Sequence, residues 1–144
     1  MIYLLDVNIL IALIDPTHVY ALRARRWFEQ NAAGGWATCP LTENGLLRIV
    51  SNPLYPNAVA SPAVAMASLI AMKKVPQHHF WADDISLTDS LRVDPDRLLT
   101  SAHLTDVYLL ALSVVHGGRF ATLDRRMMSI AVAGGAAALH VIGE

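Results

Sequence analysis

The sequence predicts an α/β fold, a single domain in which a central parallel sheet of about five short strands is flanked by helices on both faces. Short β-capable runs alternate along the chain with segments of helical periodicity, which is typical of α/β proteins. No two successive runs are joined by the tight turn of a hairpin, so successive strands are expected to be parallel. The chain shows no internal repeat or linker, and its 144 residues are enough for one such domain over residues 1–144.

The expected strands and helices follow one another in simple alternation. Strands are expected at residues 2–5, 36–39, 78–81, 120–123 and 138–142. Helices are expected at residues 9–14, 17–31, 40–51, 63–74 and 103–116, with a further short helix after Asp124. Helix ends are marked by Asp15-Pro16, Gly34-Gly35 and Gly117-Gly118. A loop is expected at the Pro- and Asn-rich residues 52–62, and a mixed region with short helices at residues 83–99.

The composition excludes several classes of protein. With 54% hydrophobic and 16% charged residues, the chain is too apolar to be disordered. Eleven Lys and Arg against twelve Asp and Glu give a net charge of −1, which excludes a globally basic nucleic-acid binder. The single Cys39 allows neither an intrachain disulfide nor a cysteine-based zinc site, as expected in a reducing compartment.

The high apolar content raises the question of a membrane. The longest uncharged stretch, residues 49–72, contains Pro53, Pro56 and Pro62 and therefore does not form one spanning helix. The first residues lack the basic segment that begins a secretory signal. We therefore expect a cytoplasmic protein without membrane association, whose excess apolar surface is covered by a second copy or a permanent partner.

Four acidic residues occupy positions where a charge is unexpected. Asp6 and Asp124 each follow an apolar strand, at its carboxyl end. Glu43 lies on the inward stripe of its helix, and Asp106 opens a helix that is apolar on every side. Buried carboxylates are rare unless they are paired, and no four cations accompany these acids in the sequence. The remaining acids, Asp15 among them, lie in polar, turn-like or terminal contexts and are expected to be solvated.

A cluster of carboxylates requires shared protons or a divalent cation. Two carboxylates about 4 Å apart repel by roughly 4 kcal/mol at an effective dielectric constant of about 20. Oxygen ligands favour a hard ion, Mg²⁺ or in its place Mn²⁺, over zinc. Because Mg²⁺ commonly bridges carboxylates to a substrate phosphate, such a cluster predicts hydrolysis of a phosphoester by a metal-activated water.

Each acid taken alone also has a plainer interpretation, as a helix cap or an ion-paired core residue. Two other functions stay open as well. A Mg²⁺-dependent phosphoester hydrolase with an aspartate nucleophile would commonly carry a second aspartate at the position of Asn8 and a lysine placed beside Asp124, and the sequence has neither. A non-catalytic acidic module that binds a partner's arginines would show no metal-dependent hydrolysis of a phosphoester.

The segments LLDVNIL (residues 4–10), TE (42–43), LTDVYL (104–109) and ATLDR (121–125) each contain one of the four acids. In this order, and over a chain of this length, they resemble the PIN-domain ribonucleases, in particular the VapC-type toxins of bacterial toxin–antitoxin pairs. The resemblance implies a Mg²⁺-dependent endoribonuclease that cuts cellular RNA and is held inactive by an antitoxin protein. It also implies a homodimer. By position, it implies that Asp6 and Asp106 bind the metal directly and that Glu43 and Asp124 complete the pocket.

Further polar residues are candidates for supporting roles. Asn8 and Thr122 each lie two residues from an acid at a strand end, where they would orient a carboxylate or a metal-bound water, or serve as ordinary turn or cap residues. Arg125 and Arg126 directly follow one of these acids and are expected to contact the RNA backbone. Arg48, about one turn beyond the predicted glutamate, would either neutralise the pocket or contact a phosphate.

Overall fold

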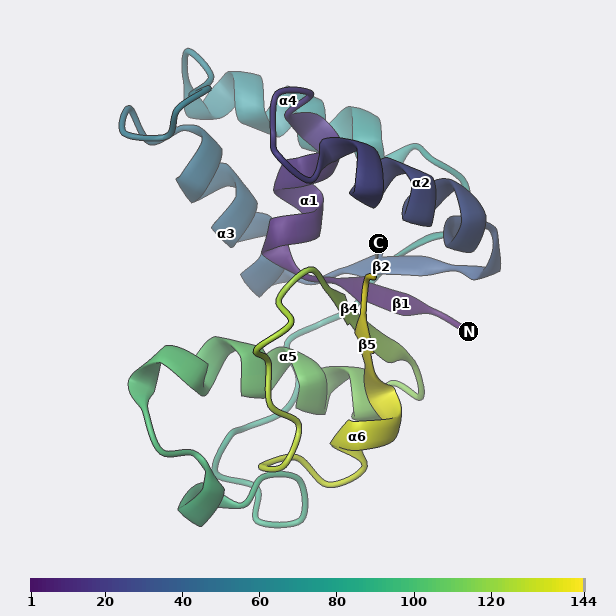
Figure 1. The fold of residues 1–144 in the computed structure, drawn as a ribbon, viewed down its shortest axis with the longest axis vertical. Coiled ribbons are helices and arrows are strands. Elements are labelled where there is room, and N and C mark those ends of the chain that lie inside the picture. The colour runs from purple at the N-terminus through teal and green to yellow at the C-terminus, as the bar shows by residue number, and fades with distance from the viewer. Residues whose placement is uncertain (144) are drawn as a thin grey trace.

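The computed structural model describes residues 1–143 and confirms the predicted α/β architecture (Figure 1). Within these residues, five strands pair in parallel in the order β3-β2-β1-β4-β5. The strands are β1 (Tyr3–Leu5), β2 (Trp36–Thr38), β3 (His78–Phe80), β4 (Arg119–Thr122) and β5 (Leu139–Val141). Since β1 is central and pairs with both β2 and β4, the carboxyl ends of these three strands lie side by side.

Helices cover both faces of the sheet. They are α1 (Val7–Ile14), α2 (Ala21–Asn31), α3 (Pro40–Val50), α4 (Pro62–Lys73), α5 (Leu104–Val115) and α6 (Gly135–Ala138). In Figure 1, α1 to α4 lie above the sheet, and α5 and α6 lie below it. The helices supply the crossover connections that parallel strands require.

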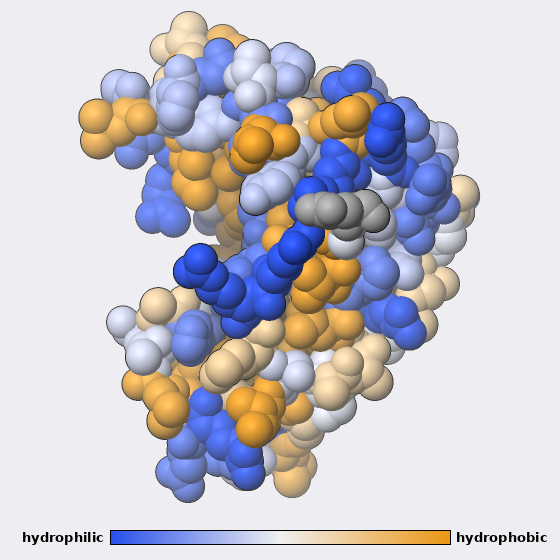
Figure 2. Space-filling model, in the orientation of Figure 1, coloured by the Kyte–Doolittle hydropathy of each residue, from blue (hydrophilic) through white to orange (hydrophobic). Residues whose placement is uncertain are grey.

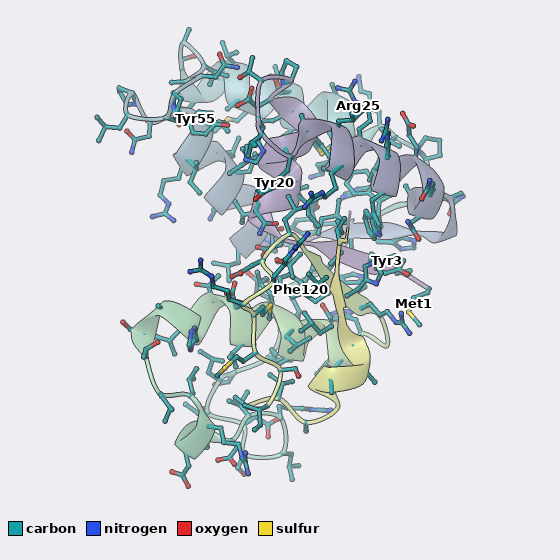
Figure 3. All side chains as sticks on the ribbon, viewed as in Figure 1. Met1, Tyr3, Tyr20, Arg25, Tyr55 and Phe120 are labelled. Atoms are coloured by element: carbon teal, nitrogen blue, oxygen red, sulfur yellow. The ribbon has the colours of Figure 1, made fainter. Side chains whose placement is uncertain are left out.

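Alternate side chains of the strands face two separate hydrophobic layers. Leu5 and Trp36 point into the layer that α1 to α4 cover, whereas Leu4 and Phe120 (Figure 3) point into the layer that α5 covers. All four are fully buried. The two-residue repeat of a strand produces this alternation. Burial on both faces is the reason why the strands are continuous apolar runs in the sequence.

Two helices begin away from their expected positions because aspartate side chains bind the neighbouring backbone. α1 begins at Val7, earlier than expected, with Asp6 as its N-cap. α2 begins at Ala21, later than expected. The carboxylate of Asp15 accepts hydrogen bonds from the backbone N–H and the hydroxyl of Thr17, at 2.9 and 2.8 Å, and holds a turn where the helix was expected to start.

The irregular segments lie mostly on the α5 side of the sheet. Residues 83–99 contain the 3-10 helix Pro95–Arg97 in an otherwise largely irregular chain. The short helix expected after Asp124 is α6, which follows an irregular loop. Of the helices in residues 1–143, none combines the length and the apolar character that crossing a bilayer requires.

Asp15 is buried, and the expectation that it is solvated is wrong. The residue is 6% exposed. Besides Thr17, its carboxylate binds the Tyr55 hydroxyl and the Asn57 side-chain amide (2.8 Å), both from the loop between α3 and α4 (Tyr55 in Figure 3). Burial acts to raise the pKa of this carboxyl, but the hydrogen bonds outweigh burial and hold the pKa well below its usual range. The loop is thereby fastened to the end of α1.

Candidate functional site

Asp6 lies where the central strand β1 ends and α1 begins. Its backbone is extended (φ −61°, ψ 154°), and its Oδ1 accepts a hydrogen bond of 2.7 Å from the backbone N–H of Val7. The residue is only 8% exposed. The partial positive charge of a helix N-terminus favours a carboxylate here. The fold thus fixes the Asp6 side chain at the edge of the sheet where the strands end.

Thr122, the last residue of the neighbouring strand β4, holds the other oxygen of this carboxylate. Its hydroxyl donates to Oδ2 of Asp6 at 2.7 Å. The same hydroxyl oxygen accepts hydrogen bonds from the side-chain amide of Asn8 (3.2 Å) and the backbone N–H of Asp124 (3.1 Å). The side-chain oxygen of Asn8 accepts from the backbone N–H of Leu123 (3.3 Å). These bonds orient the carboxylate through the ends of two adjacent strands.

Two further aspartates lie within electrostatic reach of Asp6. Asp106, in the first turn of α5, is half-buried, and Asp124 is exposed in the loop after β4. Burial, aided by the charges of Asp106 and Asp124, raises the pKa of Asp6 to about 6 against the opposing hydrogen bonds from Thr122 and Val7. The pKa of Asp106 is also raised, by burial and by Asp124, against the opposing charge of His103. The structure therefore brings three of the four predicted acids together, although Asp124 is more exposed than expected.

No ion pair formed within residues 1–143 neutralises these three aspartates, although the charge of His103 partly opposes the shift at Asp106. The ion pairs formed within residues 1–143 join Lys73 to Glu43 and connect three further pairs elsewhere in the chain. None of them involves Asp6, Asp106 or Asp124. Repulsion between neighbouring carboxylates therefore persists at neutral pH, as the raised pKa values indicate.

Glu43, the fourth predicted acid, is engaged elsewhere. Its Oε2 accepts a hydrogen bond from the Thr38 hydroxyl at 2.6 Å and lies 3.0 Å from Nζ of Lys73 on α4. The Thr38 hydroxyl also lies 2.8 Å from Nε2 of His78 on β3. Glu43 is not among the charges that raise the pKa of Asp6. The structure does not bring it into the aspartate cluster.

The position of Glu43 follows from the helix face that it occupies. As expected, it shares the inward face of α3 with Leu46 and Val50, which pack into the core above the sheet. That face looks toward the ends of β2 and β3 and toward α4. The neighbouring Asn44 faces the other way, into a cleft beside Asp6. A rotation of about 100° per helical residue separates the two side chains.

The aspartate cluster fits a hard divalent cation in its chemistry. Its donors are carboxylate oxygens, the ligand type that Mg²⁺ and Mn²⁺ prefer, and no ion pair among residues 1–143 compensates its negative charge. Within residues 1–143, no three acidic, His or Cys side chains are close enough to surround one ion. The three carboxylates are close enough to affect one another's pKa values, but they do not surround a single ion position.

A cleft of about 630 Å³ opens beside Asp6, between α3 and the start of α5. Its walls include Val7, Asn44, Arg48 and Thr105. Figure 2 shows the surface hollowed on the side where these two helices face each other in Figure 1. Asn44 was not singled out in the sequence, although its position one turn before Arg48 on the same helix face was a signal for it. The cleft gives a ligand access to Asp6.

The predicted basic residues lie at two places around the cluster. Arg48 is exposed and lines the cleft. Arg125 and Arg126 are exposed in the loop that follows β4, and the backbone N–H of Arg126 donates to Oδ1 of Asp124 at 2.9 Å. All three arginines are therefore at the surface near the acids, on elements that also carry or border the site.

Comparison with known proteins identifies close relatives over most of the chain. Ribonuclease VapC44 of Mycobacterium tuberculosis (strain H37Rv) is 44% identical over 131 residues, which cover 91% of this chain and 92% of that protein. Ribonuclease VapC39 of the same strain is 43% identical over 134 residues, covering 93% of this chain and 96% of that protein. No protein-family model matches the chain.

Solved structures share the fold at low sequence identity. VapBC2 from Rickettsia felis, crystallised with a DNA fragment from its promoter, matches with a TM-score of 0.61 at 14% identity, over 86% of this chain and 89% of that chain. VapC20 of M. tuberculosis, described as a toxin that cleaves the sarcin–ricin loop, matches with a TM-score of 0.59 at 12% identity, over 94% of each chain. With relatives 43–44% identical along nine-tenths of its length, the chain belongs to the VapC family of ribonucleases and has the fold of their PIN domain.

Proposed function

We propose that this chain is a divalent-metal-dependent endoribonuclease, the toxin of a toxin–antitoxin pair, that hydrolyses phosphodiester bonds in cellular RNA. One observation carries the proposal. Asp6, Asp106 and Asp124 lie within electrostatic reach of one another at the carboxyl edge of the sheet, without a balancing ion pair within residues 1–143, and two of them have raised pKa values. Such a cluster is unfavourable in a purely structural role and suited to binding a cation.

The residues of the cluster divide into ligands and supports. Asp6, Asp106 and Asp124 would hold Mg²⁺, or Mn²⁺ in its place, and the bound ion would activate a water for attack at phosphorus. Thr122 fixes the Asp6 carboxylate by its hydrogen bond, and Asn8 fixes Thr122. These supports keep the best-buried ligand in one orientation.

For Glu43 we propose a role that differs from the predicted one of completing the metal pocket. Its carboxylate would have to leave Lys73 and Thr38 before it could join the aspartates. We propose that it acts on the site through α3, by holding this helix against α4 and the end of β2. Its contribution to metal binding would then be small beside that of the aspartates.

The arginines around the site would bind the RNA backbone. Arg48 borders the cleft, and Arg125 and Arg126 lie in the loop that carries Asp124. A guanidinium group is well suited to phosphate oxygens because it donates two parallel hydrogen bonds. With a net charge of only −1, the chain would depend on such local contacts for RNA affinity.

An antitoxin protein is the proposed partner, and a second copy of the chain is proposed as well. One structural relative was crystallised as a VapBC2 complex. The exposed part of α4 offers surface for such contacts, because Val64 on one flank of the helix, and Met66 and Ile70 on the other, are each between 45% and 58% exposed. Exposed apolar residues grouped on one helix are typical of a protein interface.

The activity is tested with purified protein and cellular RNA. Cleavage is expected in Mg²⁺ or Mn²⁺, and EDTA is expected to stop it. Asp6→Asn and Asp106→Asn should abolish cleavage, whereas Asp96→Asn, a change of an exposed acid outside the site, should leave it intact. If the unaltered protein shows no metal-dependent cleavage, the proposal fails and a non-catalytic acidic module is favoured.

A further inference from the structure

The cleft beside Asp6 is lined by more apolar side chains than phosphate binding requires. Its apolar walls are formed by Val7, Leu41, Leu47, Ile49 and Pro62. Its volume of about 630 Å³ lies within the range of pockets that enclose one small ligand, about 300–1,000 Å³. A sugar–phosphate backbone would lose hydration against these walls without compensation. The walls suit a flat apolar group such as a nucleobase.

Two polar side chains project into this apolar cleft from one face of α3. Asn44 and Arg48 are four residues apart, both are exposed, and both line the cleft. Neither side chain forms a hydrogen bond or ion pair with another of residues 1–143. An amide offers a donor and an acceptor side by side, as the edge of a base does, and a guanidinium group matches a phosphate.

At the floor of the cleft, α3 packs closely against α1. Gly45 lines the cleft, and a Cβ atom at this position would meet Cγ2 of Val7 at 2.8 Å. The two helices therefore pack at a distance that only glycine permits without a shift. A cleft built on this contact is present before any ligand arrives, which lowers the cost of ordering on binding.

We infer that this cleft is a nucleobase pocket, which takes one unstacked base of a single-stranded or looped RNA next to the phosphodiester that is cut. The inference rests on the proposed function and names the substrate feature that the site recognises. Asp6 lines the cleft and is also a member of the aspartate cluster. A nucleotide whose base occupies the cleft therefore has its neighbouring phosphate at the cluster. Asn44 reads the edge of the base, and Arg48 holds a flanking phosphate. An unstacked base is the usual target of sequence-specific RNA recognition.

The test begins with the cleavage sites of the unaltered protein. The 5′ ends of RNA cut in Mn²⁺ are sequenced, and a short RNA that spans one preferred site serves as substrate. Asn44→Ala is expected to relax the base preference at one position beside the cut, because base contacts of this kind discriminate by about 1–3 kcal/mol, or about 5- to 150-fold. Arg48→Met is expected to raise KM by about tenfold while leaving the base preference unchanged.

A substrate that lacks one base provides an independent measurement. Removal of the base at the preferred position should lower kcat/KM of the unaltered protein by about tenfold or more, and should lower kcat/KM of Asn44→Ala by less, because only the contacts with the apolar walls remain to be lost there. Arg25→Met is the matched control, since Arg25 is also exposed but lies on α2, away from the cleft (Figure 3). It should cut as the unaltered protein does.

The outcomes separate this inference from the proposed function. If the unaltered protein does not cut RNA, the proposed function fails first. If it cuts, and Asn44→Ala and Arg48→Met cut the same sites at the same rate, the cleft holds no base and the inference is overturned. In that case a protein partner would be the remaining candidate to occupy the cleft. Thermal melts of each variant, expected to match the unaltered protein, establish that the fold is intact.

Discussion

The hydroxyl of Thr122 donates to Oδ2 of Asp6 at 2.7 Å, across 116 residues of sequence and between two adjacent parallel strands. This bond joins the end of β4 to the N-terminus of α1. The same hydroxyl accepts two further hydrogen bonds, so its one proton is committed to the carboxylate. The bond favours the ionised form of Asp6, whereas burial and the two neighbouring aspartates oppose it.

The raised pKa of Asp6 predicts that stability falls as pH rises through its titration. Burial, aided by two neighbouring charges, moves the pKa from 3.8 to about 6. The folded protein therefore binds this proton more tightly than the unfolded chain, so stability is greatest near pH 4 and declines toward pH 6 and above. The decline amounts to roughly 3 kcal/mol. Asp6→Asn should remove this decline and make the protein more stable than the unaltered chain at pH 7.5 in metal-free buffer.

Urea unfolding between pH 4 and pH 8, with EDTA present, measures this effect. Asp96→Asn serves as the control, because an exposed acid outside the cluster should not change the profile. A loss of stability in Asp6→Asn at pH 7.5 would mean that the carboxylate has a net structural role as a helix cap.

Metal binding should stabilise the protein and compete with protons. A cation that binds only the folded state raises Tm, and above Kd the stabilisation grows with the logarithm of the cation concentration. Since the carboxyls must be ionised to bind it, the affinity for Mn²⁺ should fall as pH drops below about 6, the pKa of Asp6. Calorimetric titration with Mn²⁺ at pH 7.5 and pH 5.5 measures the difference. Equal affinity at both pH values would place the ion away from Asp6.

The ion pair of Glu43 with Lys73 predicts that the two residues contribute to stability more than to metal affinity. Glu43→Gln keeps an acceptor for the Thr38 hydroxyl but loses the charge that Lys73 contacts, at a cost of about 1 kcal/mol. Lys73→Met should cost a similar amount. By titration with Mn²⁺, Glu43→Gln should weaken binding far less than Asp106→Asn. An equal loss in both variants would show that Glu43 leaves Lys73 and becomes a ligand.

The sequence predicts where functional residues at strand ends will lie better than it predicts where functional residues on helices will lie. Asp6 and Asp124 come together because parallel neighbouring strands deliver their carboxyl ends to one edge, which follows from strand order alone. For Glu43 the periodicity predicts an inward position correctly. It does not specify which neighbour the inward face meets, because that depends on how α3 packs on β2 and α4.

The burial of Asp15 cannot be predicted from the neighbouring sequence for a related reason. Asp15-Pro16 has the composition of an exposed turn. Its burial depends on Tyr55 and Asn57, about forty residues further along, in a loop whose Pro- and Asn-rich sequence specifies no conformation. A contact between two irregular segments leaves no periodic signal in the sequence.

The Asp15 network predicts the effect of removing one donor. Tyr55→Phe deletes the hydroxyl bonded to the buried carboxylate and should destabilise the protein by about 1–3 kcal/mol at pH 7. The lowered pKa of Asp15 contributes stability above pH 3.8 that is lost as the carboxyl becomes protonated at lower pH. Because the pKa of Asp15 is held well below its usual range, the carboxylate stays ionised in the folded protein at pH 3, and the difference between Tyr55→Phe and the unaltered protein should persist there. Urea unfolding at pH 7 and pH 3 measures it.

Tyr20→Phe is the matched control for this measurement, because Tyr20 is 40% exposed and its ring contacts with His18 and Arg23 do not need the hydroxyl. It should change stability by less than about 0.5 kcal/mol. If Tyr55→Phe were equally neutral, the remaining donors from Asn57 and Thr17 would suffice to hold the carboxylate. The loop between α3 and α4 would then be held in place by its backbone and apolar contacts rather than by the Tyr55 hydroxyl.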